Sequence, residues 1–179
     1  MRLIYKLILK LFDWEIKGTF PDINKCVLII VPHTSNIDFF LAVAVRSVLK
    51  IQSNYLAKEI LFKPPWGWIF KKIGGFPIKR DKNHSQVDKI ADIIKTQDKF
   101  VLAIAPEGTR KKALKWKTGF YWIAKKAEIP IIMFAFDYGI KIVKISPPFS
   151  PTNNIEKDFS EMRLFFKGAK GYNDKQSIY

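Results

Sequence analysis

Three uninterrupted apolar runs divide this chain of 179 residues and leave few ways to fold it. They span Cys26 to Val31, Phe100 to Ala105 and Pro130 to Phe136. Apolar runs of this length are typical of strands buried on both faces of a parallel sheet. Segments with helical periodicity separate the runs. This alternation predicts an α/β fold with a mostly parallel central sheet flanked by helices.

The segments between the runs supply the predicted helices and the remaining strands. The expected helices span 39–49, 85–96, 119–127 and 155–167, and the expected shorter strands span 54–57, 76–79 and 140–145. A tight turn at Tyr138 and Gly139 joins the strand ending at Phe136 to the last strand. It predicts an antiparallel pair at one edge of the sheet. We expect residues 172–179 to be a frayed tail.

The first 14 residues predict an amphipathic helix. Apolar side chains recur at helical spacing from Leu3 to Phe12, and Arg2, Lys6 and Lys10 occupy the other side. Such a helix either packs its apolar stripe on its own domain or lies on a membrane surface, and Trp14 would suit a membrane interface. No apolar run is long enough to span a bilayer.

The length of the chain predicts one domain. A mass of 20.8 kDa with 48% hydrophobic residues suits a single globular unit with its own core. We expect this domain to cover residues 1–179, with an amphipathic helix over 1–14 and a motif-bearing core over 20–150. A C-terminal helical segment over 153–168 completes it.

The charge of the chain predicts an anionic partner. Its 31 basic and 16 acidic residues give a net charge of +15. A phosphate-bearing ligand, an anionic membrane and nucleic acid all fit this charge. The single cysteine, Cys26, cannot form an internal disulfide, so the chain is compatible with a reducing compartment. Its apolar neighbours predict a buried, inert thiol.

A histidine and an aspartate at the end of the first apolar run form a candidate catalytic pair. His33 is one of two histidines, and Asp38 follows it by five residues, close to the start of the helix predicted from Phe39. We expect Thr34 or Ser35 to be the N-cap of that helix. The turn would bring the carboxylate back toward the imidazole and leave Nε2 free to take a proton from a hydroxyl.

A second polar motif follows the second apolar run. The residues are Glu107, Gly108, Thr109 and Arg110. Carboxyl ends of parallel strands share one edge of a sheet, so this motif and His33 are expected to meet there. Lys79 and Arg80 follow another predicted strand and bring further cations to the same edge. A single histidine and aspartate at this spacing are common by chance, but the second motif is rare.

At this point the sequence resembles the glycerolipid acyltransferase family, which includes lysophosphatidic acid acyltransferases. Four blocks carry the resemblance in the family's order, and it covers most of residues 20–150. They are His33-Thr34-Ser35-Asn36-Ile37-Asp38, Gly75-Phe76-Pro77-Ile78-Lys79-Arg80-Asp81, Pro106-Glu107-Gly108-Thr109-Arg110 and Ile129-Pro130-Ile131-Ile132. One departure is Ala105, where phenylalanine is common in the family.

The resemblance implies direct transfer of a fatty acyl group from a thioester to the hydroxyl of a lysophospholipid, in phospholipid biosynthesis. His33 and Asp38 would be catalytic. Substrate binding would fall to Lys79, Arg80, Glu107, Gly108, Thr109 and Arg110, with Arg80 and Arg110 on the acceptor phosphate. Glu107 is expected to hold Arg110 or its loop in place.

The resemblance also implies the partners and the setting of the reaction. Lysophosphatidic acid is the default acceptor, and either acyl-CoA or acyl carrier protein is the donor. We expect neither a metal ion nor another cofactor, because the sequence has no metal-spaced cluster of histidines and cysteines. The expected location is cytoplasmic, peripheral on the cytoplasmic face of the membrane.

Two other functions remain open from the residues. A lipid hydrolase could use Ser35 beside His33 as its nucleophile, although the sequence lacks a G-x-S-x-G motif. A nucleic-acid-binding module would explain the charge and the 15% aromatic residues. The sequence has no RNA- or DNA-binding motif, and buried strands take up much of its aromatic content. We therefore expect no nucleic-acid partner.

Overall fold

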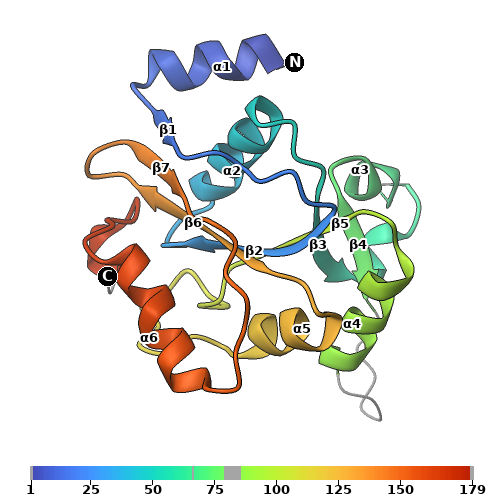
Figure 1. Cartoon of the computed structure of the whole chain (residues 1–179). Helices are drawn as coiled ribbons and strands as arrows, with labels where there is room; N and C mark the ends of the chain where they lie inside the picture. Colours follow the sequence, from blue (N-terminus) through green and yellow to red (C-terminus); the bar gives the residue numbers. More distant parts are fainter. Residues whose placement is uncertain (1, 66, 79–85, 178–179) are drawn as a thin grey trace.

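A computed structural model of the chain describes residues 2–65, 67–78 and 86–177. In this part, seven strands form one sheet in the order β1-β7-β6-β2-β5-β3-β4 (Figure 1). The strands are β1 (Glu15–Lys17), β2 (Lys25–Val31), β3 (Ser53–Lys58), β4 (Gly75–Ile78), β5 (Phe100–Ile104), β6 (Ile131–Asp137) and β7 (Ile142–Ile145). The predicted α/β fold with a mostly parallel sheet is confirmed.

Two neighbours flank the central strand β2 and run parallel to it. Leu28 of β2 is opposite Ala103 of β5 on one side and Ile132 of β6 on the other. Strand β3 extends the parallel sheet beyond β5, and β4 pairs with β3. The three strands β2, β5 and β6 therefore end at the same edge of the sheet, which is where the polar motifs begin.

The antiparallel pair is also confirmed, since β6 and β7 pair antiparallel from Phe134 opposite Ile145 to Asp137 opposite Ile142, but β1 and not β7 is the edge strand. Strand β1 is an addition that the sequence pattern did not predict. It pairs parallel with β7 from Glu15 to Lys17. Three residues without a buried side chain give no recognisable alternation, so only the partner strand defines this element.

Helices cover both faces of the sheet (Figure 1). They are α1 (Arg2–Leu11), α2 (Ile37–Val48), α3 (Gly67–Lys72), α4 (Gln86–Thr96), α5 (Gly119–Ala127) and α6 (Ile155–Phe166), with short 3₁₀ turns η1 (Glu59–Phe62) and η2 (Asp174–Gln176). Alternate residues of β2 face the two layers: Val27, Ile29 and Val31 pack with α4, α5 and α6, whereas Leu28 packs with α2.

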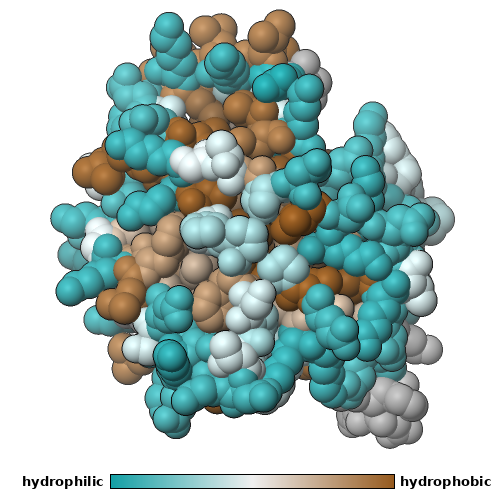
Figure 2. Space-filling model, viewed as in Figure 1, coloured by the Kyte–Doolittle hydropathy of each residue, from teal (hydrophilic) through white to brown (hydrophobic). Residues whose placement is uncertain are grey.

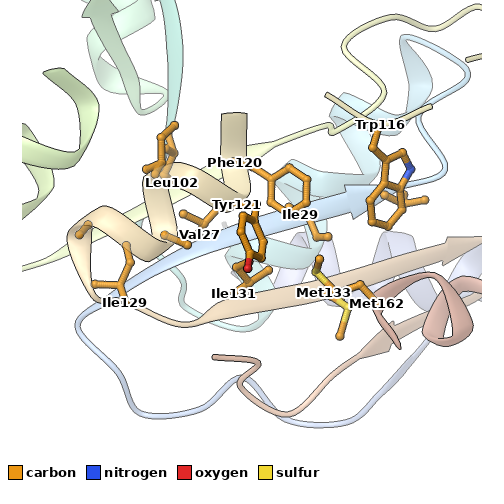
Figure 3. Close-up of a cluster of buried hydrophobic side chains, with 14 of the residues drawn as sticks. Val27, Ile29, Leu102, Trp116, Phe120, Tyr121, Ile129, Ile131, Met133 and Met162 are labelled. Carbon is orange, nitrogen blue, oxygen red and sulfur yellow. The ribbon is translucent and has the colours of Figure 1, made fainter. Parts of the chain in front are cut away.

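Large side chains fill the layer beneath α5 and α6 (Figure 3). Tyr121, Phe120 and Trp116 from the α5 region are at most 5% exposed and pack against Ile29, Ile131 and Met162. Burying a side chain of this size stabilises the fold by roughly 1.5–3 kcal/mol. The apolar pocket beside the His33 turn lies on the opposite face of the sheet, between α2 and the strands.

Helix α1 does not bury its apolar stripe. Leu9 is buried, but Leu3, Leu7 and Leu11 are 81%, 67% and 74% exposed. Figure 2 shows hydrophobic surface in brown at the top of the molecule, where Figure 1 places α1. A contiguous exposed apolar surface of this kind marks a contact with another molecule or with a membrane.

Two local predictions are corrected. Helix α2 begins at Ile37 with Asn36 as its N-cap, so neither Thr34 nor Ser35 has that role. The C-terminal segment is also not frayed through residues 172–177. Asn173 donates from its backbone N–H to Oγ1 of Thr34 and from its side chain to the Thr34 carbonyl, at 3.0 and 2.8 Å. These contacts cross 139 residues, which no local pattern can indicate.

Candidate active site

The turn between β2 and α2 brings His33 and Asp38 together. Nδ1 of His33 lies 3.1 Å from Oδ2 of Asp38. The carboxylate can only accept a hydrogen bond when ionised, so this contact places the imidazole proton on Nδ1. Nε2 is then free to accept a proton. The His33 side chain is 28% exposed and the Asp38 side chain 1% exposed, so a substrate can reach the imidazole while its partner stays buried.

Backbone groups hold the Asp38 carboxylate in the first turn of α2. The N–H groups of Thr34 and Ser35 donate to Oδ2 at 2.8 and 2.9 Å. On the other oxygen, Oδ1 accepts from the hydroxyl of Tyr138 at 2.8 Å. Burial alone would raise the pKa of Asp38, but the bonds from His33, Ser35 and Tyr138 together hold that pKa below its usual value. The carboxylate is therefore ionised near neutral pH.

Glu107 connects the second polar motif to the His33 turn. Its Oε2 accepts from the backbone N–H of His33 at 2.8 Å, and the residue is 6% exposed. We expected Glu107 to hold Arg110 or its own loop, whereas the hydrogen bond that the structure describes runs to the loop of His33. Because β2 and β5 are adjacent and parallel, this bond fixes the ends of both strands to each other.

The rest of the second motif forms an exposed loop after β5. Gly108 has a φ of +65°, a left-handed conformation that favours glycine, and a Cβ there would displace the side chain of Lys117. Thr109 accepts from the N–H of Lys111 through its hydroxyl. Arg110 is exposed at the same edge of the sheet as His33. Arg110 and Lys117 are thus both exposed cations, and the side chain of Lys117 lies next to Gly108 of this loop.

Two predicted binding residues cannot be placed. Lys79 and Arg80 lie outside the described residues, directly after β4. Strand β4 is parallel to β3, and β3 is parallel to β5, so β4 ends at the same edge of the sheet as β5. The role expected for both side chains stays a prediction.

An apolar pocket of about 500 Å³ extends from the His33–Asp38 pair between α2 and the sheet. Its walls come from β2, β5, β6 and α2, and include Leu28, Ala103, Phe134, Ala42 and Val43. Arg46 lines it eight residues beyond Asp38, about 12 Å further along the helix. Pockets of this size with apolar walls and a few polar groups at one end are typical ligand sites.

Two other kinds of reactive group, an accessible cysteine thiol and a cluster of metal-ligating side chains, are not found in the described part of the chain. Cys26 is buried, and burial raises the pKa of its thiol to about 12, which keeps it protonated and inert. No group of three or more histidine, cysteine, aspartate or glutamate side chains is arranged to hold a metal ion among the residues described. The arrangement instead fits a general base beside an apolar pocket.

Comparison with known proteins assigns the family. The family model described as Acyltransferase matches residues 14–137, which include His33, Asp38 and Glu107 to Arg110. This chain belongs to the acyltransferase family. The match also covers strands β1, β2, β5 and β6, so the family's shared region contains both the polar motifs and the walls of the pocket.

A solved acyltransferase shares the fold of this family member. The crystal structure of the 1-acyl-sn-glycerophosphate (LPA) acyltransferase PlsC from Thermotoga maritima superposes with a TM-score of 0.64. The two chains are 18% identical, and the match covers 93% of this chain and 75% of that one. At this identity the likeness supports the fold alone.

Curated relatives of this acyltransferase-family chain include the viral Protein MGF 360-15R. In African swine fever virus, isolate Warthog/Namibia/Wart80/1980, that protein is 24% identical over 135 residues, which are 74% of this chain and 46% of the relative. The protein from isolate Tick/Malawi/Lil 20-1/1983 matches equally well over 47% of its length. The chain spans about half the length of the curated relatives it matches.

Sequence reasoning on this acyltransferase missed Tyr138. Its hydroxyl reaches Asp38 across 100 residues. A signal was available, because Tyr138 follows directly after β6, and β6 is parallel to β2. The rule that placed His33 and Glu107 at one edge of the sheet also places Tyr138 there.

Proposed function

We propose that this protein transfers a fatty acyl group from a thioester to the hydroxyl of a lysophospholipid, most simply lysophosphatidic acid, to form phosphatidic acid. Nε2 of His33 takes the proton of the acceptor hydroxyl as its oxygen attacks the thioester carbonyl. The C–S bond breaks, and the thiolate leaves with a proton returned from the imidazolium. Asp38 stabilises that imidazolium, and no protein nucleophile takes part.

One observation carries this proposal: the His33–Asp38 pair lies at an apolar pocket of about 500 Å³. The pocket would take the acyl chain between α2 and the sheet, with its thioester end at His33. A hydrophobic cavity leading to a general base suits an acyl donor better than a nucleic acid, since nucleic acid needs an open, basic surface. The family match and the PlsC-like fold support the same reaction class.

The loop after β5 would bind the phosphate of the acceptor. Arg110 is exposed there, and the Nζ atom of Lys117 lies 2.8 Å from the position that a Cβ of Gly108 would take. Arginine suits a phosphate because its guanidinium donates two parallel hydrogen bonds in a fixed geometry. Lys79 and Arg80 after β4 would add to this site.

We expect Arg110→Lys to reduce transfer to lysophosphatidic acid by about tenfold, since an ammonium cannot reproduce two parallel bonds. The loss should be smaller with a neutral lysolipid. Arg163→Lys is the matched control. Arg163 is on α6 and lies over the ring of Trp116, a contact that the ammonium of lysine can also make. Acceptor kinetics of the three proteins measure the effect. Equal losses with charged and neutral acceptors would contradict a phosphate contact.

A panel of lysolipids with acyl-CoA and acyl carrier protein as donors tests the function as a whole. Transfer to at least one lysolipid, absent in His33→Ala, is the expected result. The nucleic-acid alternative predicts tight oligonucleotide binding that falls steeply with salt, together with no acyl transfer to any acceptor. Water as the main acyl acceptor would favour the hydrolase alternative.

Membrane contact belongs to the same proposal. No helix in the described ranges has the length and hydropathy to cross a bilayer. The exposed stripe of α1, with basic residues beside it, would lie in the membrane interface, on the cytoplasmic face if the partner lipids are anionic. The lysolipid could then reach His33 without leaving the membrane.

Replacing Leu3 and Leu7 together by glutamate should abolish sedimentation with anionic liposomes while leaving the fold intact, because both side chains are at least 67% exposed. Leu164→Glu is the control, since Leu164 is 66% exposed on α6, far along the sequence from α1. Sedimentation of the double variant at the wild-type level would place the membrane contact elsewhere.

A further inference from the structure

The Asp38 carboxylate is held from two sides, although only one side faces His33. Oδ2 accepts from Nδ1 of His33 and from two backbone N–H groups, and Oδ1 accepts from the hydroxyl of Tyr138 at 2.8 Å. Bonds to both oxygens stop the carboxylate from rotating about its bond to Cβ. Its plane therefore stays directed at the imidazole, which a general base requires.

The Tyr138 ring is itself fixed. Trp14, which follows α1, packs edge-on against it with ring centroids 4.8 Å apart. Tyr172 of the C-terminal segment packs in the same manner at 5.5 Å. The backbone N–H of Tyr138 donates to the carbonyl of Lys170 at 2.8 Å. Trp14 thus helps to hold the Tyr138 ring in place.

We propose that Tyr138 is a positioning residue of acyl transfer, acting through its hydroxyl on Asp38 and held in place by Trp14 and Tyr172. It touches neither substrate and is not catalytic. The inference rests on the proposed function, because it assigns Tyr138 to the same reaction. It adds a third member to the His33–Asp38 pair, contributed from the residue directly after β6.

The charged and titratable groups around the carboxylate define its pH behaviour. His33 faces it from the turn before α2, Tyr138 from the end of β6, and Tyr172 stands behind Tyr138. Burial and the neighbouring Asp38 raise the pKa of Tyr138, so the hydroxyl keeps its proton and remains a donor. Removing that donor makes the Asp38 carboxylate easier to protonate.

Tyr138→Phe tests the inference because it deletes the hydroxyl and keeps the ring. We expect kcat to fall by about 10- to 30-fold with KM within about twofold, since substrate binding is untouched. The acid limb of the pH profile of kcat should move to higher pH, because the less stabilised carboxylate takes up a proton sooner.

Tyr121→Phe is a matched control. The hydroxyl of Tyr121 also donates at 2.8 Å to a buried carboxylate, that of Asp158 on α6, on the opposite face of the sheet. This variant loses the same kind of bond, so its melting temperature should fall, while kcat and the pH profile of the remaining folded enzyme stay at the wild-type values.

The outcomes separate this inference from the proposed function. If wild type and Tyr121→Phe transfer acyl groups and Tyr138→Phe does so equally fast with the same pH profile, the inference is wrong and the function stands. Equal loss of kcat in both phenylalanine variants, with no change of profile, would also overturn it. Absence of transfer by the wild type would overturn the function and this inference together.

Discussion

His33→Ala is expected to reduce acyl transfer by about 10²- to 10⁴-fold, the usual contribution of a positioned general base. Asp38→Ala should cost a comparable factor, since its carboxylate fixes the proton on Nδ1 and stabilises the imidazolium. The double variant should be no worse than His33→Ala alone, because residues that act as one unit are not additive. Single-turnover rates with a saturating donor measure all three.

Two further substitutions make this test specific. Asp38→Asn should also be severe, because the amide could hold the wrong tautomer of His33. The NH2 group replaces one of the two oxygens, so an acceptor for His33 or for Tyr138 is lost together with the charge. Ser35→Ala should stay within a few-fold of wild type, whereas a serine hydrolase would lose all activity. Activity of His33→Ala within a few-fold of wild type would remove the central claim.

Ala42→Phe, which fills the pocket, is the second substitution with a large expected effect. Ala42→Phe places a ring between α2 and the sheet, where Ala42 lines the cavity. We expect transfer from a 16-carbon thioester to fall by about 100-fold, because the chain can no longer enter beside His33.

The donor chain length supplies the control for Ala42→Phe. A donor of four carbons needs little of the pocket, so its transfer should change by no more than a few-fold in the same variant. That comparison separates a blocked pocket from a damaged fold, since damage would affect both donors alike. Equal losses with the two donors would show that the acyl chain binds elsewhere.

Local patterns predicted most of the fold and the centre of the site. Strand β2 could be predicted because each of its side chains must be apolar to lie between two helical layers. The meeting of His33 and Asp38 could be predicted because one turn of chain joins them. Glu107 followed from the rule that parallel strands end together, although its hydrogen bond to the His33 backbone could not be foreseen.

What the sequence could not predict depends on contacts between distant segments. Strand β1 is defined only by its pairing with β7. Glu15 is opposite Ile142, which is 127 residues further along the chain. Asn173 reaches Thr34 from the last residues described, and its neighbours in sequence carry no pattern that names Thr34. The place of Tyr138 at the end of β6 brings it to the right edge of the sheet but does not name Asp38 as its partner. The exposure of the apolar stripe of α1 could not be predicted either. An amphipathic pattern does not show whether the apolar side packs on the protein's own core or faces another molecule.

The contact of Asn173 with Thr34 has a consequence for biosynthesis. As the chain emerges from the ribosome, the sheet strands and the His33 turn are made long before Asn173. Closing a loop of this length carries an entropic penalty that other contacts of the folded sheet have to offset. The turn that contains His33 therefore acquires its contacts with Asn173 only after residue 173 has been synthesised, later than its contacts with Asp38 and Glu107.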